Sequence, residues 1–135
     1  MHGTCCGRRC NFAGIHELCF NPRGRSGYEG GEVNRQIVLL TDYVDPALTD
    51  LNEKLVEEYC IIPAKRSQCG YGCSDHAGWT QRGYAATCTA EAGPNDPGLN
   101  PSYHTRRDTV DKLDMTYSLE FTKLAMAFVI EVDQA

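Results

Sequence analysis

The spacing of apolar side chains changes several times along the chain, and each spacing predicts a different element. The run Ile37–Leu40 is apolar without interruption, which is typical of a β-strand buried on both faces. Asp45-Pro46 pairs a capping residue with a proline, a combination that begins many helices. Apolar residues then recur at intervals of three or four positions, at Leu48, Leu51, Leu55 and Tyr59, so we predict a helix here. Pro63 prevents this helix from continuing.

Shorter elements are predicted after residue 73. Ser74 or Asp75 can begin a short helix that contains Trp79 and ends at Gly83. Tyr84–Thr89 favours a short strand, and residues 92–103, rich in proline and glycine, favour a loop.

A long final helix is predicted to begin at Asp114 or Thr116 and to end near Val132. Its apolar stripe comprises Tyr117, Phe121, Leu124, Ala125, Phe128 and Val132. Met126 and Ile130 widen this arc, so we expect the helix to be largely buried. The order of strand, helix, short helix, strand, loop and helix predicts a layered α/β fold.

The first 34 residues show neither a helical nor a strand period. The first 35 residues hold four of the eight Cys and seven of the 13 Gly, and five Arg against three Glu. The composition therefore shifts near residue 35. We predict a disordered or unrelated head over residues 1–34 and a folded domain over residues 35–135.

Composition and charge narrow the possible functions. The chain has 135 residues and a net charge of −5, which argues against nucleic acid or an anionic membrane surface as a partner. No apolar run is long enough to span a membrane, and none follows Met1 as in a signal peptide. Eight Cys in a chain of this length indicate disulfides or a metal site.

The head offers one candidate metal site. Its possible ligands lie within residues 1–20 and comprise Cys5, Cys6, Cys10, His16 and Cys19. Their spacing matches no common zinc module, so incidental thiols in an unstructured tail are the favoured alternative. An acidic group, Asp42, Asp45 and Asp50, could also suggest a metal site. We reject that interpretation, because Asp45 is better explained as a helix cap and Asp50 as a solvated helix residue.

Two further motifs carry possible chemistry. Cys69 and Cys73 flank a Gly-Tyr-Gly turn that is tight enough for a disulfide, although two buried thiols are an equal alternative. His104 follows a proline-rich loop and precedes Asp108, an arrangement that suits a metal ligand with a supporting carboxylate. On spacing alone this second signal is weak.

Taken together, three segments give the chain a family resemblance. They are Ile37–Asp45, Cys69–Trp79 and Asn100–Asp114, and they carry a Cys-Gly-Tyr-Gly-Cys turn and an Asn-Pro-x-x-His-Thr motif. In this order residues 36–133 resemble the C-terminal part of secreted bacterial leucyl aminopeptidases, which are two-zinc exopeptidases. The resemblance implies part of a three-layer α/β/α zinc-exopeptidase fold with a mixed sheet.

The resemblance also implies roles for individual residues. His104 matches a zinc ligand, and Tyr71 matches a tyrosine whose hydroxyl stabilises the oxyanion formed at the scissile carbonyl. Cys69 and Cys73 match a disulfide beside the substrate pocket. Three positions match the apolar pocket for the N-terminal side chain: Leu40, Cys88 and Tyr103. Asp75 and Asp108 match supporting residues rather than ligands.

Residues 1–34 contain no counterpart of the family's other zinc ligands or of its general-base glutamate. The resemblance therefore implies an aminopeptidase that acts on peptide N-termini, with at most a partial zinc site here, and we expect this chain alone to be inactive. A non-catalytic remnant or binding module, and a Cys-rich metal-binding module in residues 1–20, remain alternatives. By resemblance the location is extracellular or periplasmic. We also expect the strand at 37–40 to lack neighbours, and the chain to self-associate through an exposed sheet edge.

Overall fold

The computed structural model describes residues 35–94, 96, 99, 102, 104–112 and 114–133. These residues form a mixed α/β fold, as the sequence predicted. The elements in chain order are β1 (Ile37–Leu40), α1 (Pro46–Tyr59), β2 (Ala64–Ser67), α2 (Asp75–Gln81), β3 (Thr89–Ala90), the 3-10 helix η1 (Val110–Lys112) and α3 (Met115–Asp133). The predicted head at residues 1–34 lies outside the described residues.

The sheet has β1 at its centre. Its strand order is β2-β1-β3, with β2 parallel to β1 and β3 antiparallel to it. Ile37, Val38 and Leu39 have no exposed surface, which confirms the prediction of a strand buried on both faces. The expectation that β1 would lack neighbours is wrong, because this chain supplies a strand on each side of it. Self-association stays a prediction.

Helix α1 begins and ends where the sequence predicted. Asp45 caps its N-terminus by accepting a 3.0 Å hydrogen bond from the backbone nitrogen of Leu48, and Pro46 is the first helical residue. The helix ends at Tyr59, and Cys60 is already extended. Its buried face includes Leu55 and Val56.

Strand β2 was not predicted, because Ala64-Lys65-Arg66-Ser67 has the polarity of a loop. The segment is a strand because its backbone pairs with β1, from Ile37 opposite Ala64 to Leu40 opposite Ser67. At this outer position its side chains reach solvent, and Arg66 pairs with Asp50 and Glu53 of α1, each at 2.6 Å.

The strand predicted over Tyr84–Thr89 is much shorter in the structure. Only Thr89 and Ala90 form β3, opposite Leu39 and Val38. Before Thr89 the chain follows the turn beyond β1 instead, since the backbone nitrogen of Asp45 donates to the carbonyl of Ala86 at 2.6 Å. The short helix predicted around Trp79 is confirmed as α2, and Gly83 follows it with φ +83°, a conformation that favours glycine.

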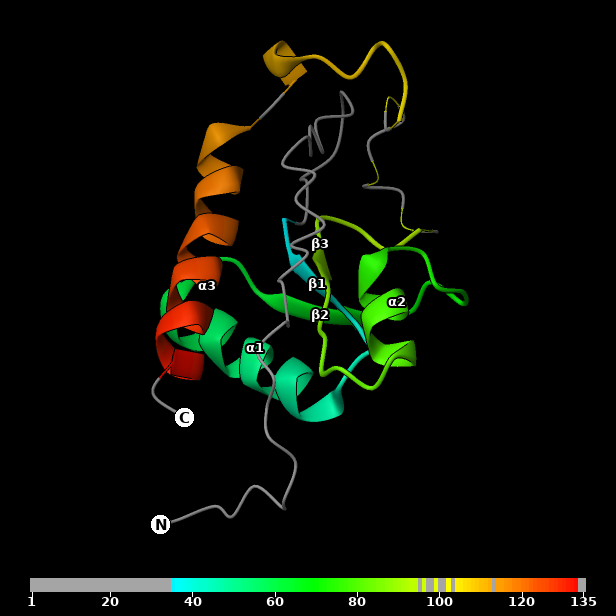
Figure 1. Ribbon diagram of the computed structural model, residues 1–135. Coiled ribbons are helices and arrows are strands. Elements are labelled where there is room, and N and C mark those ends of the chain that lie inside the picture. Colours follow the sequence, from blue (N-terminus) through cyan, green and yellow to red (C-terminus); the bar gives the residue numbers. More distant parts are fainter. Residues whose placement is uncertain are drawn as a thin grey trace.

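The helices cover the two faces of the sheet, with α1 and α3 on one face and α2 on the other (Figure 1). Ile37 and Leu39 of β1 pack into the main core beside Leu55, Phe121 and Leu124 from α1 and α3. Val38 and Leu40 point to the opposite face, where they form a second cluster with Cys88. β1 therefore contributes to both cores, which explains its uninterrupted apolar sequence.

Helix α3 is buried on one side only, so the expectation that it is largely buried is wrong. Asp114 caps it by accepting hydrogen bonds from the nitrogens of Thr116 and Tyr117, at 3.0 and 3.1 Å. Phe121 and Leu124 are at most 2% exposed, whereas Met126 and Ile130 are 62% and 52% exposed. α1 and the central strand β1 pack against the buried side of this helix, and the wider part of the apolar arc reaches solvent.

Candidate active site

Three segments of the chain meet at one edge of the sheet, at the carboxyl end of β1. The backbone nitrogen and the hydroxyl of Thr41, just after β1, both donate to the carbonyl of Ser67 at the end of β2, at 3.0 and 3.1 Å. On the other side, the nitrogen of Leu40 donates to the carbonyl of Cys88 at 3.0 Å. This edge therefore gathers the ends of the two parallel strands and the residue that precedes β3, and such edges commonly carry ligand sites in α/β folds.

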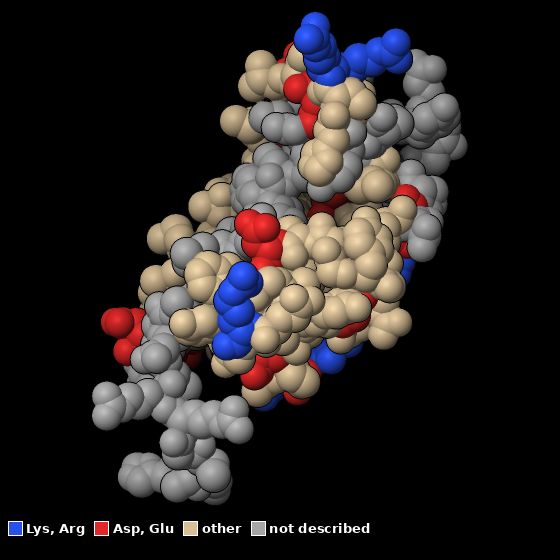
Figure 2. Space-filling view, turned by 45° about the vertical axis from the view of Figure 1, so that its right-hand side comes forward, with Lys and Arg blue, Asp and Glu red and all other residues tan. Residues whose placement is uncertain are grey.

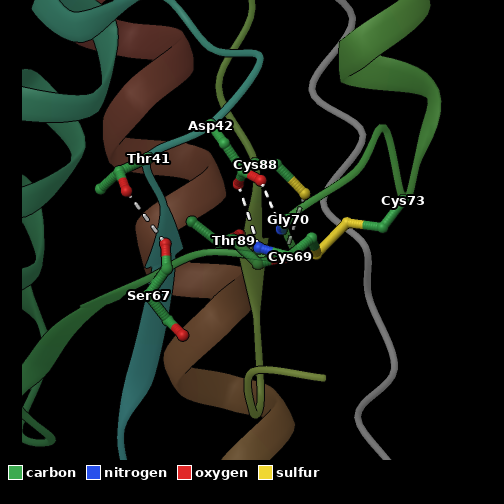
Figure 3. The surroundings of a disulfide bond; sticks show 8 residues. All are labelled: Thr41, Asp42, Ser67, Cys69, Gly70, Cys73, Cys88 and Thr89. Atoms are coloured by element: carbon green, nitrogen blue, oxygen red, sulfur yellow. Dashed lines mark hydrogen bonds between the residues drawn. A yellow bond between two sulfur atoms is a disulfide. The ribbon is translucent and has the colours of Figure 1, made fainter. Parts of the chain in front are cut away.

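Asp42 fixes the loop that follows β2. Its carboxylate accepts a 3.1 Å hydrogen bond from the backbone nitrogen of Cys69 and a 2.7 Å bond from that of Gly70 (Figure 3). Gly70 has φ +81°, which a residue with a side chain rarely adopts. Sequence reasoning excluded Asp42 as a metal ligand and gave it no other role. No signal in the sequence indicates this role, because the nitrogens of Cys69 and Gly70 lie 27 and 28 positions further along the chain.

The same loop is closed by a disulfide between Cys69 and Cys73, whose Cα atoms lie 6.2 Å apart. Tyr71 lies between them, and its side chain is 60% exposed. The loop is thus held by a covalent bond and by two hydrogen bonds, while its central phenol faces solvent. A hydroxyl on such a fixed support can act as a positioned hydrogen-bond donor.

Residues predicted to line an apolar pocket lie beneath this loop. Leu40 and Cys88 form one cluster with Val38, and the disulfide packs against it. The structure thus brings Leu40, Cys88 and the disulfide together. Leu40 is 3% and Cys88 1% exposed, so they form the floor under the loop rather than an open wall. Tyr103, the third predicted lining residue, lies outside the described residues.

Asp75 lies on the other side of the loop, as the first residue of α2, and is exposed. It borders an open cleft of about 610 Å³. The cleft is lined by Gly72, Ser74, Asp75, Ala77, Gly78, Trp79, Gln81 and Arg82. Its lining is distinct from the floor formed by Leu40 and Cys88.

His104 belongs to a separate segment, the connection that leads to η1. Its side chain is exposed and its backbone has φ +58°. Asp108, half-buried on the same connection, donates its backbone nitrogen to the carbonyl of Thr105 at 3.1 Å. In Figure 1 this connection runs along the top of the molecule, whereas the disulfide loop lies beside α2. The structure therefore places His104 and Tyr71 on two different segments.

The donor groups in the described part of the chain are too dispersed to form a metal site. Among these residues no group of three or more His, Cys, Asp or Glu side chains could hold a metal ion. A stable zinc site needs three or four protein ligands. His104 and its described surroundings therefore do not make up such a site. The alternative Cys-rich site in residues 1–20 lies outside the described residues.

The face of the molecule drawn in Figure 2 carries mixed charge, with basic and acidic groups scattered among uncharged side chains. No helix in the described part of the chain is long and apolar enough to cross a membrane.

Comparison with known proteins assigns the family. The sequence profile of peptidase family M28 matches residues 29–129. The chain is 33% identical to a probable aminopeptidase of Saccharomyces cerevisiae, over 87% of this chain and 31% of that protein. It is 38% identical to a probable leucine aminopeptidase 1 of Trichophyton verrucosum, over 79% of this chain and 29% of that protein.

Solved structures agree with the sequence match. LapB of Legionella pneumophila aligns with a TM-score of 0.70 and 37% identity, over 76% of this chain and 27% of LapB. The LapA aminopeptidase of the same organism aligns with a TM-score of 0.65 and 38% identity, over 71% of this chain and 25% of LapA. The chain therefore belongs to peptidase family M28, and the resemblance to leucine aminopeptidases is confirmed. It spans less than a third of the length of these relatives.

Proposed function

We propose that this chain is part of a zinc-dependent aminopeptidase that removes leucine-like residues from the N-termini of peptides. The family match over residues 29–129 and the relatives named as leucine aminopeptidases support this. The observation that carries it is the position of Tyr71, which is exposed on a loop fixed at the carboxyl ends of two parallel strands.

Tyr71 supplies a hydrogen bond to the substrate in this proposal. When a peptide bond is attacked, negative charge develops on its carbonyl oxygen, and a donor already in place stabilises that charge. The disulfide and the Asp42 hydrogen bonds hold the backbone on both sides of Tyr71, which limits the freedom that the phenol would otherwise lose on binding. Leu40 and Cys88 support this loop from below.

The zinc site of the proposed enzyme needs ligands beyond the described residues. By resemblance His104 contributes one ligand, but the described part of the chain offers no group of three. A general-base glutamate also has no counterpart in residues 1–34, and such a base typically contributes about 10²–10⁴-fold to the rate. We therefore expect these 135 residues to have no aminopeptidase activity on their own.

An extracellular or periplasmic location is part of the proposal. The disulfide at Cys69 and Cys73 supports it, because such bonds persist in oxidising compartments and are rare in the cytosol.

A chimera tests the proposed function. Residues 36–133 replace the matching segment of LapB, and hydrolysis of leucine-p-nitroanilide is followed. We expect turnover, and we expect Tyr71→Phe to lower kcat about 10²–10³-fold, as for loss of one oxyanion donor. Tyr59→Phe, at the exposed end of α1, is the matched control and should leave kcat unchanged. A folded chimera that shows no turnover, or an unchanged kcat after Tyr71→Phe, would contradict the proposal.

A further inference from the structure

Three of the eight cysteines are gathered at the carboxyl end of β1. Cys69 and Cys73 form the disulfide, and Cys88 is a thiol in the apolar cluster against which that disulfide packs. In Figure 3 the sulfur of Cys88 points toward the two sulfurs of the disulfide. No role described so far uses the thiol of Cys88.

The path of the chain explains why these sulfurs meet. Cys69 follows β2 and Cys88 precedes β3, and these strands lie on opposite sides of β1. Strands two places apart in a sheet are separated by about 9.6 Å, which is beyond the reach of a disulfide. Asp42, however, binds the nitrogens of Cys69 and Gly70 and so draws this loop over the end of β1, toward Cys88.

We infer that Cys88 is an internal nucleophile that exchanges with the Cys69–Cys73 disulfide. The Cys88 thiol loses its proton and its sulfur attacks the sulfur of Cys69. A Cys69–Cys88 bond forms as the Cys69–Cys73 bond breaks, and the Cys73 sulfur leaves as a thiolate that takes up a proton. One disulfide and one thiol are present before and after, so no external oxidant or reductant is consumed.

The burial of Cys88 favours reaction with the neighbouring disulfide over reaction with reagents in solution. Cys88 is 1% exposed, which shields it from reagents in solution, whereas its disulfide partner already lies in the same cluster. Cys60 offers a contrast, because it is a thiol that packs against the main core on the other face of β1. The proposal therefore assigns the exchange to Cys88 and excludes Cys60.

The exchange would change the support of Tyr71. In the structure the disulfide closes a short loop around Tyr71, from Cys69 to Cys73. A Cys69–Cys88 bond would keep Cys69 at the sheet edge and release Cys73, together with the chain that leads into α2. This inference does not depend on peptidase activity.

Tryptic peptide mapping tests the exchange directly. The full chain is used with Cys5, Cys6, Cys10 and Cys19 replaced by Ser, so that no head thiol takes part. It is incubated at about pH 8 without redox reagent, quenched with acid, and its thiols are blocked with N-ethylmaleimide in denaturant. Trypsin cuts after Arg66, Arg82 and Arg106, so Cys69 and Cys73 share one peptide and Cys88 lies in the next.

The two disulfide states then give different products. The original state gives peptide 67–82 with an internal disulfide and peptide 83–106 with one maleimide. The exchanged state gives the two peptides joined, with the maleimide on Cys73. We expect joined peptides to accumulate in native buffer, to be lost in Cys88→Ser and to persist in Cys60→Ser. We also expect Asp42→Ala to lower their initial rate of formation several-fold.

Two results would overturn the inference. One is the absence of joined peptides after a day in native buffer while they form readily in urea, which would limit exchange to the unfolded chain. The other is a joined product that survives Cys88→Ser, which would assign the exchange to another thiol.

Discussion

Tyr117 and Gln36 are joined by a hydrogen bond that ties the first turn of α3 to the backbone just before β1. The Tyr117 hydroxyl donates to the Gln36 carbonyl and also lies 3.2 Å from the carbonyl of Glu91, just after β3. Its ring packs edge-on against Phe121, with centroids 5.3 Å apart. One buried side chain thus joins α3 to the central strand and to the segment that follows β3.

This contact predicts a loss of stability at high pH. Burial raises the pKa of the Tyr117 phenol to about 12, whereas a tyrosine in an unfolded chain titrates near 10. The stability that the neutral phenol contributes is therefore complete below about pH 10 and is lost as the pH rises toward 12. The free energy of unfolding, measured in urea, should fall more between pH 7 and about pH 10.5 for the unmodified chain than for Tyr117→Phe. An equal drop in both would contradict this assignment, and Tyr59→Phe serves as the exposed control.

Side chains on the two sides of α3 should respond differently to truncation. Leu124 has no exposed surface, so Leu124→Ala should lower the free energy of unfolding by about 2–5 kcal/mol. Met126 is 62% exposed, and Met126→Ala should change it by less than about 0.5 kcal/mol. Urea denaturation measures both. Similar losses would show that the outer face of α3 is covered in solution.

Glu120 should stabilise the junction between α1 and α3. Its buried carboxylate accepts a 2.8 Å hydrogen bond from the backbone nitrogen of Ile61 and pairs with Lys123 at 2.7 Å. Glu120→Ala leaves the Ile61 donor without this acceptor, at a cost of about 1–3 kcal/mol in the free energy of unfolding. Glu131→Ala, at an exposed position of the same helix, is the control. Equal stability of the two variants would be inconsistent with this role.

Asp42 should control the order of the loop around Tyr71. Asp42→Ala removes the acceptor for the nitrogens of Cys69 and Gly70, so both amides should exchange with solvent faster by about tenfold or more. Amide hydrogen exchange followed by NMR measures this, and the amides of β1 should keep their protection. Asp50→Ala, on the surface of α1, provides the comparison. Unchanged exchange at Gly70 would mean that the disulfide alone fixes the loop.

Local patterns predicted the elements that depend on few contacts. The apolar run of β1, the Asp45-Pro46 start of α1 and the glycine after α2 each act within a few residues, and each was confirmed. Strand β2 escaped prediction because its pairing with β1, and not its own sequence, makes it a strand. The exposure of Met126 was not predicted, because the local pattern of α3 does not show how many other elements pack against the helix.

Some features of the candidate site were likewise predictable from the sequence, whereas others depend on the fold. The turn between Cys69 and Cys73 was visible in the sequence, because the two cysteines and two glycines lie within five residues. The anchoring of that turn by Asp42 joins residues 27 and 28 positions apart, and only the fold brings them together. The burial of Leu40 and Cys88 likewise follows from the loop that lies above them.

The most direct measurement is the rate at which the 135-residue chain releases p-nitroaniline from leucine-p-nitroanilide in added zinc. In the proposed function the chain carries substrate-facing residues, whereas its described part holds no complete metal site. We therefore predict a rate equal to that of buffer with zinc for a chain shown to be folded by circular dichroism, both before and after His104→Ala. Turnover by the unmodified chain that disappears in His104→Ala would contradict it, because His104 would then belong to a working metal centre within these residues.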